Sequence, residues 1–368
     1  MSLDTLAKGE QALLHLLRIH LWHESPDVKF LGGLSQDDWT LCYRLACMQG
    51  VRALAFEALL QLPEGLDIPG ALSMRWCEST ERLYSRNREC MNVLASLVRE
   101  CTAAGLEPVL LKGAGIASLY PQPLSRECGD IDLWFPGKSS DADNWFREMG
   151  YDVIPPDMMH SKCIYKGFEI ENHYSLFRRG KPKNRHVEPA AMCLWRKEGG
   201  RLLPLAGGAS IMIPGPGLQL LHNARHIISH LTERFVLRNI VDWALLLLDC
   251  DKEDKRQEVR GVFNQVGFSR AIAVVEALAV EYLGMPREMA LFMRGGEGRL
   301  VERLYEKMLR PTPKYIEGRG PIIYFIARWR HFNEPYCLYR LIYGMSYPHY
   351  VARKFCYQAR ENLKKRLI

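Results

Sequence analysis

The sequence predicts an α+β fold in which a small α/β core lies between two helical regions. Apolar residues recur at helical spacing through the N-terminal part and again after residue 217, whereas short alternating stretches typical of strands are confined to the part between. Glycine and proline mark the breaks. We therefore expect an N-terminal helical region over residues 1–105, the α/β core over 106–206, and a C-terminal helical region over 207–368.

The N-terminal region is expected to be entirely helical. Leucines at helical spacing predict a helix over residues 6–22, and Ser35 with the acids that follow it is typical of a second helix start. Another helix is predicted over residues 53–62. A long helix is then expected over residues 72–104, because Gly105 is a natural C-terminal stop.

The α/β core begins with residues 109–111, an apolar run that we predict to be a strand. The run stops at Lys112 and Gly113, and residues 116–120 have helical character, so the order is strand, glycine turn, helix. Neither a GxGxxG fingerprint nor a GxxxxGK[ST] loop is present in the chain. The Rossmann and P-loop patterns are therefore excluded.

A second strand is predicted over residues 130–135 by their strict alternation of polar and apolar side chains. The apolar side chains face a core, so Asp130 and Asp132 share the other face. Two neighbouring carboxylates are unfavourable unless a cation neutralises them, and Mg²⁺ or Mn²⁺ suits such oxygen ligands. The pair is also compatible with a merely solvated face, and the motif needs support from elsewhere.

That support comes from another alternating stretch, residues 168–172. It follows residues 162–165 through a Lys-Gly turn, which predicts a hairpin, and it presents Glu169 and Glu171 on one face. A third carboxylate on a neighbouring strand is what a two-metal site, or a metal site with a general base, requires. Periodicity does not separate the two glutamates.

The order of these motifs carries a resemblance over residues 108–176. Lys-Gly is followed by Tyr, Pro, Arg, Gly-Asp-Ile-Asp-Leu and later Ile-Glu-Asn-His-Tyr-Ser-Leu, at Lys112, Gly113, Tyr120, Pro123, Arg126, residues 129–133 and residues 170–176. This order resembles a largely uncharacterised family of bacterial nucleotidyltransferases within the polymerase-β-like superfamily. The resemblance continues weakly to His222, His226 and Asp242.

The resemblance implies an α+β protein with a small mixed-sheet, polymerase-β-like nucleotidyltransferase core. It implies an enzyme that uses Mg²⁺ or Mn²⁺ and moves a nucleotidyl group from ATP or another NTP to an acceptor. The acceptor, whether a small molecule, a protein or RNA, is not named by the sequence. In the superfamily the first two acids bind metal and the third helps to activate the acceptor hydroxyl, which implies catalytic and metal-binding roles for Asp130, Asp132 and Glu171.

The glycine turn of the superfamily holds nucleotide phosphates. The resemblance therefore implies nucleotide-binding roles for Lys112, Gly113, Arg126 and His173. It also favours Glu171 over Glu169 as the third carboxylate, because Glu171 precedes His173 by two residues, as in the family.

Two positions depart from the family pattern. Ala114 stands where the superfamily usually has Ser or Gly, so a hydroxyl for the phosphate is missing, and Asn172 replaces a hydrophobe. Neither removes a carboxylate. An alternative interpretation is a non-catalytic nucleotide- or nucleic-acid-binding protein on the same fold.

The glycine- and proline-rich residues 206–217 are interpreted as a connector, followed by an amphipathic helix. Its polar face carries His222, His226 and His230 at intervals of four. These histidines could hold a transition metal, but a zinc hydrolase of the HExxH type needs Glu where Asn223 stands. We expect them to pack against the α/β core instead.

The basic residues are concentrated at the C-terminal end. Residues 303–368 hold 14 lysines and arginines against four glutamates, a charge of +10, while the whole chain of 368 residues carries +7. Arg328, Arg330, Arg340 and Lys354 alternate with aromatic residues. This pattern suits nucleic acid or an anionic lipid surface, and equally a helical bundle with an aromatic core and a basic solvated face.

The composition is that of an ordinary globular protein, with 48% hydrophobic and 25% charged residues. The first residues lack the apolar segment of a signal peptide, and no apolar stretch is long enough to span a membrane. Eleven cysteines, without any C-x-x-C pair, favour reduced thiols over a disulfide scaffold or a zinc ribbon. The expected location is the cytoplasm.

Overall fold

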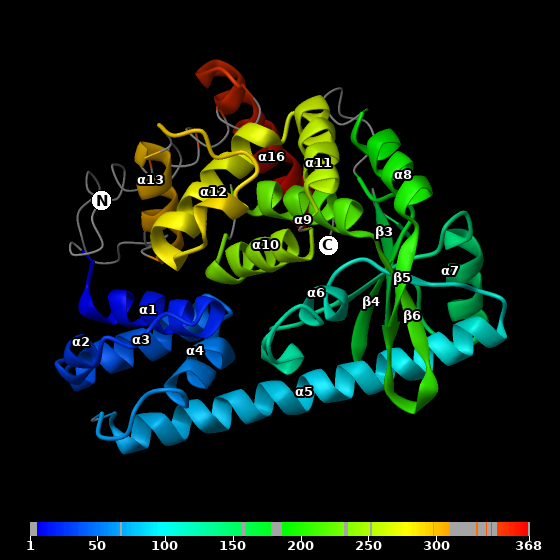
Figure 1. Ribbon diagram of the computed structural model, residues 1–368. Coiled ribbons are helices and arrows are strands. Elements are labelled where there is room, and N and C mark those ends of the chain that lie inside the picture. Colours follow the sequence, from blue (N-terminus) through cyan, green and yellow to red (C-terminus); the bar gives the residue numbers. More distant parts are fainter. Residues whose placement is uncertain are drawn as a thin grey trace.

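A computed structural model of the chain describes residues 6–66, 68–156, 159–177, 186–231, 235–250, 252–296, 298–309 and 344–366, together with Trp329, Tyr336 and Arg340. Within these residues a six-stranded mixed sheet lies beside two groups of helices (Figure 1). The expected combination of a mixed sheet with flanking helices is therefore present.

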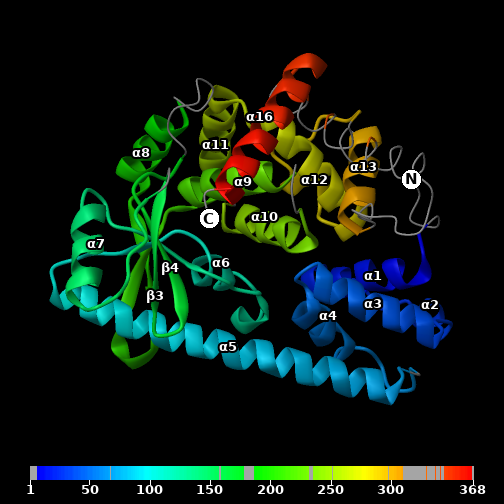
Figure 2. The ribbon, with the colours of Figure 1, turned by 180° about the vertical axis from the view of Figure 1, so that it is seen from behind.

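The four predicted N-terminal helices are confirmed as α1 (Lys8–Trp22), α3 (Gln36–Met48), α4 (Arg52–Leu59) and α5 (Gly70–Ala103). A short helix that was not predicted, α2 (Val28–Gly32), lies between the first two. Ser35 caps α3, since its hydroxyl accepts a hydrogen bond from the Asp38 amide. Helix α5 runs from the other N-terminal helices to the sheet, where its C-terminal half covers one face (Figures 1 and 2).

The sheet has the strand order β3-β4-β2-β1-β6-β5. Its strands are β1 (Val109–Leu110), β2 (Ile131–Trp134), β3 (His160–Tyr165), β4 (Phe168–His173), β5 (Gly200–Pro204) and β6 (Ser210–Pro214). The helices between them are α6 (Ala114–Ala117), α7 (Ser139–Glu148) and α8 (Val187–Glu198), with 3₁₀ turns at Pro123–Ser125 and Ala206–Gly208. Strands β2 and β4 are parallel neighbours, although they are separate in the sequence.

The hairpin predicted between residues 162 and 172 is confirmed as β3 and β4. Lys166 and Gly167 form its two-residue turn with φ values of 47° and 85°. Positive φ at both central positions gives a turn whose twist matches that of paired strands. The turn therefore determines the register in which β3 lies against β4.

The connector interpretation of residues 206–217 is wrong. Residues 200–214 form the hairpin β5–β6, and β6 pairs in parallel with β1 near the middle of the sheet. The alternation in β6 is visible in its burial, because Ile211 and Ile213 are buried. Glycines at the hairpin end and after β6 concealed a short strand, and the sheet thus extends beyond residue 206.

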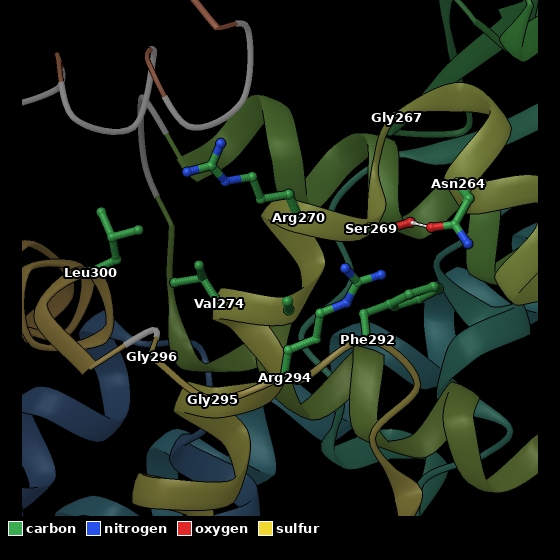
Figure 3. A pocket seen from close by; sticks show the side chains of 11 residues that line it. Asn264, Gly267, Ser269, Arg270, Val274, Phe292, Arg294, Gly295, Gly296 and Leu300 are labelled. Atoms are coloured by element: carbon green, nitrogen blue, oxygen red, sulfur yellow. Dashed lines mark hydrogen bonds between the residues drawn. The ribbon is translucent and has the colours of Figure 1, made fainter.

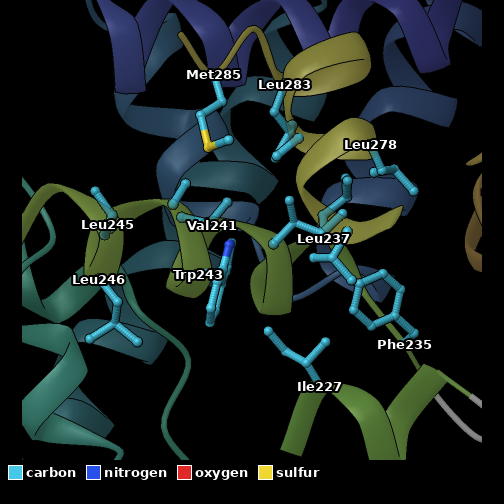
Figure 4. Close-up of a cluster of buried hydrophobic side chains, with 14 of the residues drawn as sticks. Ile227, Phe235, Leu237, Val241, Trp243, Leu245, Leu246, Leu278, Leu283 and Met285 are labelled. Atoms are coloured by element: carbon cyan, nitrogen blue, oxygen red, sulfur yellow. The ribbon is translucent and has the colours of Figure 1, made fainter. Parts of the chain in front are cut away.

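The C-terminal helices are α9 (Pro216–Leu231), α10 (Leu237–Asp249), α11 (Glu253–Val266), α12 (Ser269–Leu283), α13 (Gly298–Leu309) and α16 (Tyr347–Arg366), with a 3₁₀ turn at Arg287–Met289. Buried residues of α9, α10 and α12 meet around Trp243 (Figure 4). The same hydrophobic cluster includes the leucines of α1. The N-terminal and C-terminal helices therefore share one core.

In the part of the chain that the structure describes, none of the helices is both long enough and apolar enough to cross a membrane.

Candidate active site

One face of strands β2, β3 and β4 gathers most of the charged side chains singled out from the sequence. Asp132 on β2 is the register partner of Glu171 on β4, and Glu171 is in turn paired with Lys162 on β3. His173 lies two residues beyond Glu171, on the same face. The period of two residues thus repeats across three strands and forms a polar patch on one face of the sheet.

Asp132 is the most buried of the carboxylates. Its Oδ1 accepts hydrogen bonds from the Lys112 ammonium at 2.9 Å and from His173 Nε2 at 3.0 Å. Burial alone would raise the pKa of Asp132, but the charges and hydrogen bonds of Lys112 and His173 hold it well below its usual range. Its Oδ2 is buried with no hydrogen-bond partner among the described residues.

Lys112 lies between the two aspartates, because its Nζ is also 3.8 Å from Asp130 Oδ2. Although burial opposes the charged ammonium, the Asp132 and Asp130 carboxylates raise the pKa of Lys112 above its ordinary value. Burial, and then repulsion by Asp132, raises the pKa of Asp130. Gly113 adopts a φ of +63°, which brings the turn close to the backbone of Asp130.

Both glutamates of β4 lie near Asp130. One carboxylate oxygen from each of Asp130, Glu169 and Glu171 lies within 4.8 Å of the other two. Lys162 Nζ joins the glutamates at 2.7 Å from Glu169 Oε1 and 2.6 Å from Glu171 Oε1. The Glu169 side chain is 42% exposed and that of Glu171 only 10% exposed. The geometry brings Glu171 to the aspartates without excluding Glu169.

A line of histidines leads away from the carboxylates. Ring centroids are separated by 5.2 Å between His160 and His173, 6.1 Å between His173 and His222, 4.7 Å between His222 and His226, and 6.4 Å between His226 and His230. Helix α9 therefore packs its histidine face against the site, as predicted. No cluster of three metal-ligating side chains in the described ranges includes a histidine of α9.

Arg126 is directed to another partner. Its Nε and Nη2 donate to the two oxygens of Asp242 on α10, both at 2.8 Å, and Tyr120 Oη donates to the same carboxylate at 2.6 Å. Arg126 and Asp242 are both buried. The predicted contact of Arg126 with a phosphate is therefore not supported by its position, and it stays a prediction.

Asn172, a departure from the family pattern, is accommodated on the opposite side of β4. Its side-chain amide donates to the Ser139 carbonyl at 2.8 Å and to Asp143 Oδ1 at 2.7 Å. Tyr174 Oη donates to the other oxygen of Asp143. The polar residue thus ties β4 to α7 and leaves the carboxylate face unchanged.

Sequence reasoning missed His160 and Lys162 on β3. His160 Nε2 lies 3.2 Å from Glu171 Oε1. The signal was present, because a two-residue turn at 166–167 forces residue 162 opposite 171 and residue 160 opposite 173. Continuing the β3–β4 pairing from the turn back to residue 160 would have placed both side chains beside the acids.

The predicted basic surface at the C-terminal end falls partly outside the described residues. Arg328 and Arg330 lie outside them, whereas Arg340 and Lys354 are described. Among the C-terminal aromatic residues that are described, Tyr336 contacts Tyr347 and Tyr350 with ring centroids 5.1 Å and 5.4 Å apart, and Tyr350 is fully buried. These rings pack against each other, so the nucleic-acid surface stays a prediction.

A cavity of about 520 Å³ lies elsewhere, between α11, α12 and the loop around residue 295 (Figure 3). The guanidinium groups of Arg270 and Arg294 and the apolar side chains of Val274 and Phe292 line it. None of the residues that line it belongs to the carboxylate face. The cavity is therefore separate from the candidate site.

Comparison with known proteins gives one family and a distant structure. A family model described as an uncharacterised nucleotidyltransferase matches residues 35–284. The crystal structure of an antigenic nucleotidyltransferase-like protein from Paracoccidioides brasiliensis is similar at 12% identity and a TM-score of 0.34, covering 53% of this chain and 92% of that one. A similarity at this TM-score establishes neither the fold nor the function of this chain. No curated protein matches the chain.

Proposed function

Because this chain belongs to the family of uncharacterised nucleotidyltransferases, we propose that it transfers a nucleotidyl group from an NTP to an acceptor in a reaction that depends on Mg²⁺ or Mn²⁺. The observation that carries the proposal is the convergence of Asp130, Asp132 and Glu171 with Lys112 on one face of the sheet. We infer that this sheet and its flanking turn serve as the polymerase-β-like core.

The residues of this face fit a divalent metal. One carboxylate oxygen from each of Asp130, Glu169 and Glu171 lies within 4.8 Å of the other two, and the buried Oδ2 of Asp132 has no hydrogen-bond partner in the described part of the chain. A buried carboxylate oxygen without a partner is costly and would be satisfied by a cation. Mg²⁺ or Mn²⁺, when bound, supplies charge neutralisation to the phosphates of the nucleotide. Asp130, Asp132 and Glu171 would hold it.

The protein's own groups divide the remaining tasks. Asp132 stays ionised, because Lys112 and His173 lower the pKa of its carboxyl group. Glu171 is also kept ionised, since hydrogen bonds from His160 and Lys162 outweigh its burial and lower its pKa. Those hydrogen bonds occupy Oε1. Oε2 is thus the atom of Glu171 that serves as a further ligand or accepts the proton of the attacking hydroxyl.

The phosphates would lie at the glycine turn. Lys112 presents an ammonium group between the aspartates, where it can neutralise charge on the leaving pyrophosphate. Gly113 has no side chain at a positive φ, so a phosphate can approach the backbone closely. His173 orients Asp132 through its 3.0 Å hydrogen bond and lies where it could contact a phosphate.

The proposal is tested by a transfer assay with α-labelled NTPs and Mg²⁺ or Mn²⁺. Small hydroxyl compounds, RNA and the protein itself serve as acceptors, and transferred label is measured. Asp130→Asn and Asp132→Asn should each lose at least about a hundredfold in rate. Asp249→Asn, which changes a carboxylate at the end of α10, is the control and should retain the rate. Equal activity of all three variants would contradict the proposal.

The alternative is a non-catalytic nucleotide-binding protein on the same fold. Ala114 favours it, because no hydroxyl follows the glycine turn to contact a phosphate. Calorimetric titration separates the two functions. Nucleotide binding that depends on Asp130 and Asp132, without transfer to any acceptor class, would favour the binding protein.

A further inference from the structure

Two sets of metal-ligating side chains on this face share Glu171. One set consists only of carboxylates, namely Asp130, Glu169 and Glu171, whereas the other combines the imidazoles of His160 and His173 with Glu171. We propose that the site is an asymmetric two-metal centre, in which His160, Glu171 and His173 bind a transition-metal ion such as Mn²⁺, Co²⁺ or Zn²⁺ beside an oxygen-only magnesium position. Only the magnesium position of this centre rests on the proposed function.

The strand register holds the two histidine ligands and the glutamate ligand together. His160 and His173 are directly opposite each other in the β3–β4 pair, and Glu171 is two residues before His173 on the same face. The donor atoms of all three lie within 4.8 Å of one another. A two-residue turn fixes this register, so the ligands come from a rigid hairpin and not from loops.

The separations are close to those around one ion. His160 Nε2 is 3.2 Å from Glu171 Oε1, and His173 Nε2 is 3.8 Å from Glu171 Oε2. Ligands at about 2.0–2.2 Å from a shared ion are roughly 3–3.5 Å from each other. Shifts of a few tenths of an ångström would therefore complete the coordination. His173 Nε2 would then bind the ion in place of donating to Asp132 Oδ1, which lies 3.0 Å away and borders the same position.

The two positions differ in the metals that they favour. Imidazole nitrogen suits zinc, cobalt and other transition metals, whereas Mg²⁺ takes oxygen ligands almost exclusively. A position with two histidines and one carboxylate should therefore discriminate against Mg²⁺. Glu171 belongs to both ligand sets and has two carboxylate oxygens, so one oxygen can bind the transition metal while the other serves the magnesium position.

Lys162 competes for the same carboxylate. Its ammonium contacts Glu171 Oε1 at 2.6 Å and Glu169 Oε1 at 2.7 Å, so an ion that binds Glu171 must displace it. The Lys162 side chain is 35% exposed and can move into solvent. Lys162→Gln should accordingly bind the transition metal more tightly than the wild type.

The test measures metal binding directly. Chelator-treated full-length protein is titrated with Co²⁺, and its visible absorption bands report the ligands and the affinity. His160→Gln should weaken Co²⁺ binding at least about tenfold, while Lys162→Gln strengthens it. His230→Gln is the matched control, because His230 ends the same line of rings and belongs to neither ligand set. It should bind within about twofold of the wild type.

A second measurement does not depend on any variant. Pulsed electron paramagnetic resonance of Mn²⁺ bound in the presence of excess Mg²⁺, which occupies the oxygen-only position, should show coupling to imidazole nitrogen in the wild-type protein. Unchanged Co²⁺ affinity in His160→Gln, or Mn²⁺ without nitrogen coupling, would overturn the inference.

This outcome is separable from that of the transfer assay. Histidine-dependent Co²⁺ binding in a protein that transfers no label supports the inference and counts against the proposed function. Transfer with Mg²⁺ in a protein that shows no Co²⁺ binding supports the proposed function and counts against the inference.

Discussion

The pair formed by Arg126 and Asp242 predicts a large loss of stability from one small change. In Asp242→Asn the amide retains an oxygen that can accept from Arg126 Nε and Tyr120. It places an NH₂ group against Arg126 Nη2, where the second carboxylate oxygen now accepts at 2.8 Å. The guanidinium is then left charged, buried and with a donor facing a donor.

The magnitude follows from the burial of both partners. The side chains of Arg126 and Asp242 are 8% and 3% exposed, so water cannot replace the lost partner. Removing one member of a buried ion pair costs about 3–5 kcal/mol, mainly because the remaining charge is uncompensated. We therefore expect the free energy of unfolding to fall by at least about 3 kcal/mol.

The chain contains a matched control on the same helix. Arg201 also donates two hydrogen bonds to one carboxylate, from Nη1 and Nη2 to Asp249 at 2.8 Å and 2.7 Å, but the Arg201 side chain is 41% exposed. Asp249→Asn should cost only about 0–1 kcal/mol, because water solvates the freed guanidinium. Both variants are measured by urea unfolding followed by circular dichroism and fluorescence.

The comparison decides what Arg126 does. Equal costs for the two variants, or a loss below about 1 kcal/mol in Asp242→Asn, would refute the reasoning that burial makes this pair structural. Arg126 would then be available for the phosphate role suggested by the family resemblance. The predicted difference instead assigns Arg126 to holding the segment before Asp130 against α10.

The other predictions concern the site, the C-terminal helices and the basic end of the chain. Glu171→Gln should reduce transfer at least about a hundredfold, while Glu169→Gln stays within a few-fold of wild type; the reverse ranking in the transfer assay would mean that the third carboxylate is Glu169. Burial raises the pKa of Glu276 from 4.5 to about 7, so its contribution to stability is complete below pH 4.5 and is lost as the pH rises through 7. Urea unfolding of Glu276→Gln should therefore show a weaker decline between about pH 4.5 and 7, by up to about 1.4 kcal/mol per pH unit, and parallel curves for both proteins would contradict this. Binding of RNA, if the basic end forms a nucleic-acid surface, should weaken steeply with salt, and absence of binding to RNA and duplex DNA at low salt would favour the helical bundle.

Local patterns predicted most of the secondary structure correctly. The helices of the first hundred residues other than α2, and the β3–β4 hairpin, follow from spacing, caps and turn residues that lie within a few positions of each other. The predicted strand that carries Asp132 is present for the same reason. Strand β6 was missed because a short strand between glycine-rich segments has too few residues for its alternation to stand out.

For the site, motifs within short segments of the sequence identified the acids but not all of their neighbours. Asp130, Asp132, Glu171, Lys112 and His173 come together as the motifs indicated. The partner of Arg126 lies 116 residues away in the sequence, so no local pattern could name it. The roles of these residues in binding metal and nucleotide remain proposals.

The sequence by itself determined which side chains share a face, because the period of a strand or helix is a property of the backbone and is independent of the rest of the fold. Only the tertiary structure decided which faces meet. The parallel pairing of β2 with β4, which sets Asp132 beside Glu171, joins strands separated by a helix and another strand. Helix α9, which brings His222 to His173, depends equally on long-range packing. Such contacts are selected by the burial of apolar surface over the whole chain, and that sum cannot be read from any one segment.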